Sequence, residues 1–303
     1  MQYFPIFAQA DGLKILMIGA GEVASRKLEL LTRTQAHIHV IAPDVCDVVM
    51  SMANQGLIAL EQRFAELDDL QGIDLLYMAT ADDELNRQFA LQAKTLGLWV
   101  NVVDAPKLCN FITPAIVDRG RLQVAISTSG AAPVFARELR ARLETWLPES
   151  LSDLFDFIAA KRVEVQQRLP VFSQRKVFWE QFFRLNGDRY DEYTPKHFEQ
   201  AFDSLEASGE LLLVEEHTPI DLLPLAAVPM MQRLDWICSD LSLPERLSEL
   251  VRRDAGRMPF VAMSELALKL DRGERLLVYG SSSSIAQLKA HFPMAKHLRP
   301  GAL

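Results

Sequence analysis

The chain has 303 residues, of which 49% are hydrophobic and 24% are charged, and its net charge is −8 at pH 7. This composition predicts a soluble globular protein with enough apolar residues for a core, and the length suggests about two domains. The acidic balance argues against a general nucleic-acid-binding protein, which usually carries a basic surface. It permits an anionic small-molecule ligand in a locally positive cleft.

Cysteine usage and the amino-terminal residues bear on the cellular compartment. Cys46, Cys109 and Cys238 are far apart and show no C-x-x-C spacing, so neither a disulfide framework nor a structural zinc site is expected. The first residues lack the basic region and apolar core of a signal peptide, and no apolar run approaches the ~18 residues of a membrane span. We therefore expect a cytoplasmic protein that binds neither membranes nor nucleic acids.

One glycine-rich stretch organises the amino-terminal part of the chain. A mostly apolar run at residues 13–18 leads into Gly19-Ala20-Gly21, and a helical pattern begins at once. This succession predicts a buried strand, a tight turn at Gly19, and close approach of a pyrophosphate at Gly21, with Ala24 allowing helix and strand to pack. The free N–H groups of the helix N-terminus would face the phosphates. An ordinary strand-to-helix turn is the alternative interpretation.

Strands and helices alternate through the next eighty residues. Strands are predicted at 37–42, 57–61, 74–80 and 98–103, and helices at 45–55 and 84–96. This alternation predicts an α/β fold with a parallel, doubly wound sheet, in which ligands bind outside the carboxyl ends of the strands. We expect four residues near those ends to converge on one crevice: Gly19, Asp44, Thr80 and Asp104.

Asp44 is the acidic residue expected to bind the adenosine ribose, which favours NAD over NADP. It follows Pro43 and comes later than the usual ~20 residues after the glycine motif.

The pattern changes beyond residue 106. An alternating strand at 121–127 leads into a loop of small residues, Thr128–Ala132, and a helix at 134–146 begins after Pro133. The N–H groups of this loop could hold a substrate carboxylate, and a plain helix cap with proline at the first position is the alternative. Residues 151–205 are helical in pattern, and their recurrent basic residues are interpreted as solvated helix faces.

Several segments together resemble the amino-terminal half of siroheme synthase, the precorrin-2 dehydrogenase and sirohydrochlorin ferrochelatase family. Asn101-Val102-Val103-Asp104 followed by Ala105-Pro106 is the most specific of them. The resemblance covers residues 1 to about 205. The other matching segments are 4–7, 19–24 with Arg26-Lys27, 79–83, 111–115, 124–130 and 175–180.

The resemblance implies a Rossmann-type domain at 1–113, a dimerisation domain at 114–150 and a small helical domain at 151–209, assembled as a homodimer. It implies oxidation of precorrin-2 to sirohydrochlorin with NAD, and insertion of iron(II) to give siroheme, a step that only some relatives keep. Asp104 takes the family's role of general base in both steps. A cap at a strand end is the alternative role for Asp104.

The resemblance also implies which residues bind the cofactor and the substrate. An acidic protein must present a local positive lining to a tetrapyrrole with eight carboxylates, and three arginines near the loop are the best candidates. No His/Cys cluster offers a metal cage, so iron(II) is expected as a substrate. Cofactor contacts are expected at Gly19, Gly21, Glu22, Val23, Pro43, Asp44 and Thr80, and substrate contacts at Ser127, Thr128, Ser129, Gly130, Arg119, Arg137 and Arg140.

Residues 210–303 are too few for the complete uroporphyrinogen-III methyltransferase that follows in the long form of this family. Several of their segments nevertheless look like pieces of that enzyme's first half. The expected glycine-rich loop is replaced by Glu215-Glu216-His217-Thr218-Pro219, and Ser281–Ser284 stand where a second glycine-rich motif would lie. We predict a degenerate α/β remnant without methyltransferase activity, and an unrelated appended domain is the alternative.

A different class of function fits the same motifs: an NAD-binding sensor or interaction protein without tetrapyrrole chemistry. Asp104 discriminates between the two, because a dehydrogenase needs a base at that strand end and a sensor does not.

Overall fold

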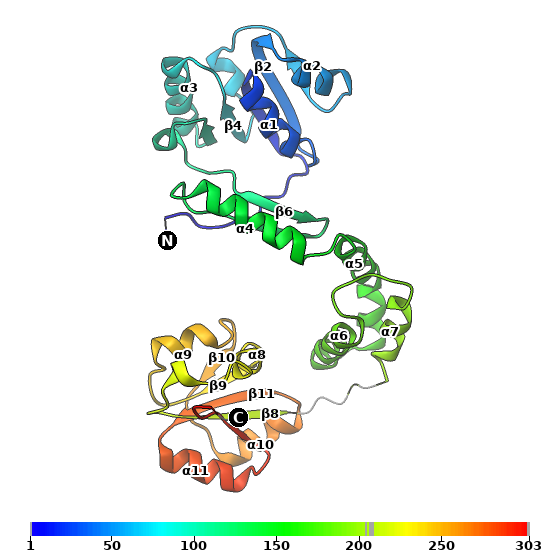
Figure 1. Cartoon of the computed structure of the whole chain (residues 1–303), viewed down its shortest axis with the longest axis vertical. Helices are drawn as coiled ribbons and strands as arrows, with labels where there is room; N and C mark the ends of the chain where they lie inside the picture. Colours follow the sequence, from blue (N-terminus) through cyan, green and yellow to red (C-terminus); the bar gives the residue numbers. More distant parts are fainter. Residues whose placement is uncertain (1, 204, 206–208, 302–303) are drawn as a thin grey trace. The chain divides into compact units, whose positions relative to one another are not determined.

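The computed structural model describes residues 2–203, 205 and 209–301 (Figure 1). The chain folds into two compact units, one made of residues 1–117 with 124–144 and the other of residues 118–123 with 145–303. None of the helices in the described part of the chain combines the length and hydropathy that a membrane span requires.

The first unit is built on a parallel sheet. Residues 14–102, all of them described, form five strands in the order β3-β2-β1-β4-β5, and every neighbouring pair is parallel. The predicted doubly wound α/β fold is therefore confirmed. The strands are β1 (Lys14–Ala20), β2 (His37–Val45), β3 (Ala59–Glu61), β4 (Leu75–Met78) and β5 (Trp99–Val102).

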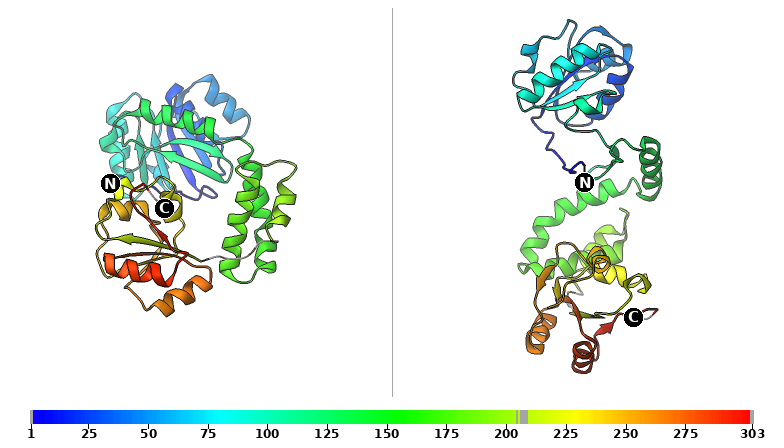
Figure 2. Two further views of the ribbon diagram at one scale, coloured as in Figure 1. Left: turned by 60° about the horizontal axis from the view of Figure 1, so that its bottom comes forward. Right: turned by 90° about the vertical axis from the view of Figure 1, so that its left-hand side faces the viewer.

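Helices cover both faces of this sheet (Figure 2). Ile15 and Met17 of β1 pack with residues of α1 and α2, whereas Leu16 and Ile18 pack with residues of α3 on the opposite face. Burial on both faces explains why β1 reads as a continuous apolar run. The helices are α1 (Glu22–Leu31), α2 (Asp47–Asn54) and α3 (Asp83–Thr95), with short 3-10 helices η1 (Leu67–Leu70) and η2 (Pro106–Leu108).

Strand β2 is longer than the sequence predicts. We expected it to end at Ala42, but it continues through Pro43 to Val45, which pairs with Ala20 across a register shift in β1. Proline has no N–H, so it can lie in a strand where the sheet makes no hydrogen bond to that position. Irregular positions in the pairing are typical places for it. The extension places Asp44 next to the residue that pairs with the glycine turn.

The residues after the sheet form a hairpin and a series of helices. Strands β6 (Ala115–Arg119) and β7 (Leu122–Ile126) pair with each other, and the boundary between the two units runs through them. The helices are α4 (Pro133–Trp146), α5 (Leu151–Arg168), α6 (Phe172–Asn186) and α7 (Thr194–Gln200). A core of Leu154, Val165, Phe178, Phe182 and Phe198 joins α5, α6 and α7. The predicted end of the helical domain includes residues 206–208, which lie outside the described residues.

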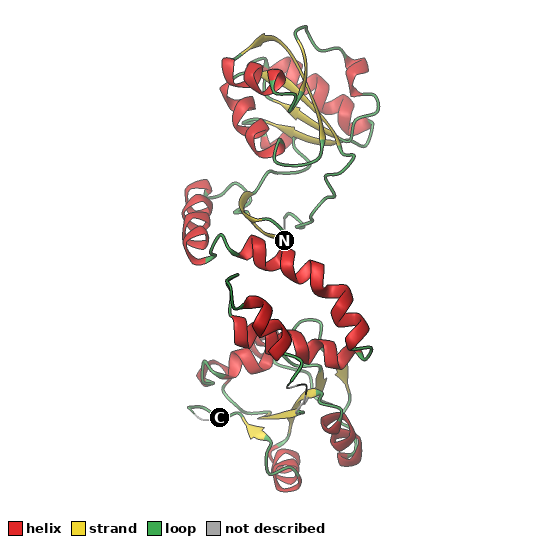
Figure 3. Cartoon of the chain, turned by 90° about the vertical axis from the view of Figure 1, so that its right-hand side faces the viewer, coloured by secondary structure: helices red, strands yellow, loops and turns green. Residues whose placement is uncertain are grey.

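The carboxyl-terminal residues form a second α/β fold, built on a parallel sheet (Figure 3). Residues 210–297, all of them described, supply its strand order β10-β9-β11-β8-β12, with apolar clusters on both faces. The predicted small α/β unit is confirmed. Its strands are β8 (Glu210–Glu215), β9 (Trp236–Cys238), β10 (Gly256–Met258), β11 (Arg275–Gly280) and β12 (Lys296–His297), and its helices are η3 (Ile220–Leu222), α8 (Ala227–Met231), α9 (Glu245–Leu250), α10 (Met263–Asp271) and α11 (Ser282–His291).

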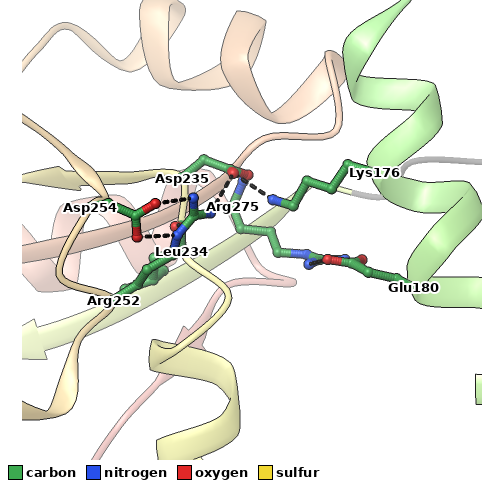
Figure 4. Close-up of polar contacts among 7 residues, drawn as sticks. All are labelled: Lys176, Glu180, Leu234, Asp235, Arg252, Asp254 and Arg275. Atoms are coloured by element: carbon green, nitrogen blue, oxygen red, sulfur yellow. Dashed lines mark hydrogen bonds and ion pairs between the residues drawn. The ribbon is translucent and has the colours of Figure 1, made fainter. Parts of the chain in front are cut away.

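Charged side chains join α6 to this second sheet (Figure 4). Lys176 Nζ lies 2.5 Å from Asp235 Oδ1, and the Arg275 guanidinium donates two hydrogen bonds to the Glu180 carboxylate, one of them at 2.6 Å. Asp235 also accepts a hydrogen bond from the Arg275 backbone N–H at 3.0 Å. Arg252 contacts the same Asp235 carboxylate at 3.7 Å. These contacts fix the amino-terminal ends of β9 and β11 against α6.

We expect Arg275→Gln to lower the free energy of unfolding by about 1–2 kcal/mol, because it leaves the partly buried Glu180 carboxylate without its two charge-assisted hydrogen bonds. Urea unfolding followed by circular dichroism measures this. Arg246→Gln is the matched control, since Arg246 pairs only with exposed carboxylates and should change stability by less than about 0.5 kcal/mol. Equal effects of the two substitutions would contradict the importance of the α6 contacts.

Candidate functional site

Gly19, near the end of β1, and Gly21, just after it, are required for different structural reasons. Gly19 has φ +103, and a Cβ built on it would lie 2.4 Å from the Ala79 carbonyl oxygen, so no other residue fits between the ends of β1 and β4. Gly21 has an ordinary φ of −85, and a Cβ there would meet nothing within 4 Å. Gly21 therefore leaves open space beside the start of α1.

This open space fits a dinucleotide phosphate. Helix α1 begins at Glu22, and no side chain caps its first N–H groups, which leaves them available to an anion. Glu22 and Val23 are exposed on the first turn of the helix, and Asp44 is exposed in β2 beside the glycine turn. The Thr80 hydroxyl donates to Asn86 Oδ1 at 2.8 Å, so this side chain also stabilises the start of α3.

The strand register places the end of β5 on the same edge of the sheet. Ile18 pairs with Met78, and Met78 pairs with Val102, so these three residues lie in one row across β1, β4 and β5. Asp104 follows this row by two residues. The carboxylate is exposed, as a group that receives protons from a ligand must be.

A pocket of about 640 Å³ lies within the first unit, and Asp104 lines it together with the loop at residues 127–130. The predicted catalytic residue and the predicted substrate loop are thus neighbours. Thr128 Oγ1 accepts a hydrogen bond from the Ala132 N–H at 3.2 Å, and Ser127 Oγ accepts one from the Ser129 N–H at 3.0 Å. These hydroxyls hold the loop in shape.

Backbone strain is concentrated in this pocket. Among the residues that the structure describes, Asp104 with φ 55 and Ser129 with φ 53 are the two non-glycine residues in the left-handed region. Both line the same pocket. Such conformations cost free energy and cluster at functional sites, where surrounding structure maintains them.

The three predicted arginines are not gathered with these residues. Arg137 and Arg140 of α4 are exposed, and neither is among the described residues that line the pocket. Arg140 pairs with Glu144 at 3.6 Å. Arg119 belongs to the second unit, where its Nε donates to the Leu147 carbonyl at 3.0 Å.

Sequence analysis assigned no role to Lys27, which lines the pocket from α1. Its Nζ donates to Asn101 Oδ1 at 3.3 Å and lies 5.4 Å from the centre of the Tyr77 ring. Burial lowers the pKa of Lys27, against the opposing influence of Cys109 and Asp104. The only sequence signal was its place in the Arg26-Lys27 match, because Asn101 is far away in the chain.

At the corresponding edge of the second sheet, polar and charged side chains contact one another. Glu215 at the end of β8 accepts a hydrogen bond from Ser282 Oγ at 2.8 Å, and its other oxygen lies 3.1 Å from His297 Nε2, an ion-pair contact outside hydrogen-bond geometry. Burial is the main cause that lowers the pKa of His297. Charged side chains with partners thus occupy the strand end where a ligand-binding loop would need glycines.

Three family models match consecutive parts of the chain. Residues 6–115 match the model described as "Putative NAD(P)-binding", residues 119–145 match the sirohaem biosynthesis protein central region, and residues 150–189 match the sirohaem synthase dimerisation region. Together with the open glycine turn, the first match confirms a nicotinamide dinucleotide as the cofactor.

The curated relatives are siroheme synthases. The chain is 39% identical over 269 residues to that of Pseudoalteromonas atlantica, covering 85% of this chain and 58% of the relative. It is 38% identical over 266 residues to that of Ectopseudomonas mendocina, covering 85% and 57%, and 38% identical over 291 residues to that of Pseudomonas aeruginosa PAO1, covering 92% and 62%. The chain therefore spans less than two thirds of the length of these relatives.

A solved structure shares the fold. SirC, precorrin-2 dehydrogenase, has a TM-score of 0.55 and 24% sequence identity, and the match covers 67% of this chain and all of that one. Residues 6–189 of the chain match, in order, an NAD(P)-binding model and two models of sirohaem biosynthesis proteins. The chain is thus similar to siroheme synthases over most of its own length, and the resemblance predicted from the sequence is confirmed.

The two glycines allow a matched test of the cofactor site. Gly21→Ala should fold normally, because its backbone conformation and surroundings accept a methyl group, but it should weaken NAD binding at least about tenfold by occupying the space of the pyrophosphate. Gly19→Ala should instead destabilise the protein by about 1–3 kcal/mol, through backbone strain and the clash with Ala79. Calorimetric titration and thermal unfolding separate these effects, and unchanged NAD binding by Gly21→Ala would rule out this site.

Proposed function

We propose that the chain oxidises precorrin-2 to sirohydrochlorin with NAD and then inserts iron(II) to give siroheme. The observation that carries this proposal is that one pocket contains both the strained backbone positions and the carboxylate proposed as the base. Asp104 and Ser129 are held in left-handed conformations, and both line the pocket that α1 of the dinucleotide-binding domain borders. The name of the relatives supports the same pathway.

The proposed roles follow from the placement of each residue. The N–H groups at the start of α1 and the space at Gly21 hold the phosphates, with Glu22, Val23, Pro43 and Thr80 around them. Asp44 accepts hydrogen bonds from the ribose hydroxyls, and its charge would repel a 2′-phosphate, which favours NAD over NADP. NAD, when bound, accepts the hydride that precorrin-2 loses.

Asp104 accepts the protons in both steps. Oxidation of precorrin-2 releases one proton with the hydride, and iron insertion releases the two pyrrole N–H protons of sirohydrochlorin. An exposed carboxylate at the pocket wall can receive them and pass them to solvent. The loop of Ser127, Thr128, Ser129 and Gly130 binds a substrate carboxylate, and the arginines at 119, 137 and 140 remain candidates for further carboxylates.

We expect Asp104→Asn to reduce the rates of precorrin-2 oxidation and iron insertion by about 10²–10⁴-fold, without weakening NAD binding. Asn has the same shape and tolerates the left-handed conformation, so the fold is retained. Absorbance during incubation with precorrin-2 and NAD, and then with iron(II), measures both steps. Asp68→Asn, an exposed carboxylate in η1, is the control. Identical rates for Asp104→Asn and the native chain would remove Asp104 from the mechanism, and NAD binding without any turnover by the native chain would favour a sensor.

We also propose a cytoplasmic homodimer. Sequence analysis assigned dimerisation to residues 114–150, and the family model with that description matches residues 150–189. Val134 and Phe135 of α4 are 65% and 55% exposed, and a second subunit would cover such apolar side chains.

The carboxyl-terminal unit is proposed to lack methyltransferase activity. Glu215 and Glu216 end the first strand of its sheet, and two carboxylates there would oppose the carboxylate of S-adenosylmethionine. The absence of glycine also prevents close approach of the ligand to the backbone.

Calorimetric titration of the chain with S-adenosylmethionine should give no saturable heat. NAD titrated into the same sample is the positive control, because its binding site is on the first unit. Saturable binding of S-adenosylmethionine in the micromolar range would show that this unit retains a ligand site.

A further inference from the structure

Lys27 is a partly buried cation without a carboxylate partner among the described residues. Its one hydrogen bond is to a neutral amide oxygen, Asn101 Oδ1. Burial of an ammonium group costs free energy unless an anion compensates it, which is why buried lysines are usually paired. Nothing in the stability of the first unit explains why this position carries a charge.

The surroundings hold the ammonium group in place. Asn101 is 8% exposed, and its Nδ2 donates to the Phe111 carbonyl at 3.1 Å, which turns Oδ1 toward Lys27. The Tyr77 ring lies beneath Nζ, and its hydroxyl is 3.2 Å from Thr113 Oγ1. These contacts orient the lysine. Asp104 opposes the effect of burial on its pKa, but no carboxylate of the described residues forms an ion pair with it.

Lys27 also has a particular place in the pocket. It is the one basic residue among the described residues that line the pocket, and Asp104 is the one acidic residue. An anionic ligand in this pocket therefore meets a single cation, located on α1. Arg137 and Arg140 of α4 are not among the described residues that line the pocket.

We propose that Lys27 is a substrate-binding residue whose ammonium group pairs with one peripheral carboxylate of the tetrapyrrole. This inference rests on the proposed function. An ion pair in a partly desolvated site is stronger than one at the surface, so the free energy that Lys27 costs in the empty site is recovered when the carboxylate binds. The pairing also fixes the orientation of the macrocycle relative to Asp104.

The test uses the full chain and three variants: Lys27→Met, Lys27→Arg and Arg26→Met. We expect Lys27→Met to raise the KM for precorrin-2 at least about tenfold, while kcat changes by less than about threefold and the Kd for NAD is unchanged. Its Tm should stay the same or rise, because methionine removes the cost of the buried charge. Lys27→Arg should keep the KM within about threefold. Arg26→Met, which removes the same charge from an exposed position on α1, should match the native chain.

Other outcomes would overturn the inference. An unchanged KM in Lys27→Met would show that the carboxylate of the substrate binds elsewhere. Turnover of precorrin-2 by the native chain would still support the proposed function in that case. A lowered kcat with a shifted pH profile would mean that Lys27 acts on Asp104 instead. A lowered Tm that Lys27→Arg does not restore would indicate a structural role. If the native chain neither binds nor oxidises precorrin-2, the proposed function itself fails, and that result does not depend on any variant.

Discussion

The candidate site depends on the close approach of the ends of β1 and β4. Near the end of β1, Gly19 has φ +103 and lies directly against the Ala79 carbonyl, where a side chain has no room. Since β4 pairs on its other side with β5, this contact aligns three strand ends in one row. The cofactor turn and Asp104 are then held on one edge of the sheet by backbone pairing alone. Their relative position is consequently insensitive to most side-chain changes in the pocket.

Most of the fold could be predicted because its strands are buried on both faces. Continuous apolar runs such as residues 15–18 leave no alternative to a central parallel strand, and Gly, Asp and Pro mark the helix ends. Asp82, for example, accepts hydrogen bonds from the N–H groups of Glu84 and Leu85 at the start of α3. The predicted end of β2 at residue 42 was wrong, because we expected the following proline to end the strand. A register shift in the neighbouring strand accommodates Pro43, and a single sequence does not reveal such a shift.

The site was less predictable than the fold. Asp104 and the loop at residues 127–130 could each be singled out because they follow predicted strand ends, and that property is local in sequence. That they line one pocket was not predicted. The place of Lys27 could not be predicted, because its hydrogen bond to Asn101 joins residues 74 positions apart in the chain. It links α1 to β5, past the intervening strand β4. Arg140 shows that proximity in sequence does not place a side chain in the pocket. It lies one turn beyond Ala136, which lines the pocket, yet it is exposed and pairs along the helix with Glu144.

The sheet at residues 210–297 is stabilised without the loop that follows β8. Its two apolar clusters and parallel strand order need only the buried residues of the strands and helices. The contacts with α6 use Asp235 and Arg275, at the amino-terminal ends of β9 and β11. Ligand binding in such a sheet would use the opposite edge, where Ser282 of α11 donates to Glu215 and the hydroxyls of Ser281 and Ser284 bond to each other. The contacts with α6 and the side chains at the end of β8 therefore lie on opposite edges of the sheet and involve different residues.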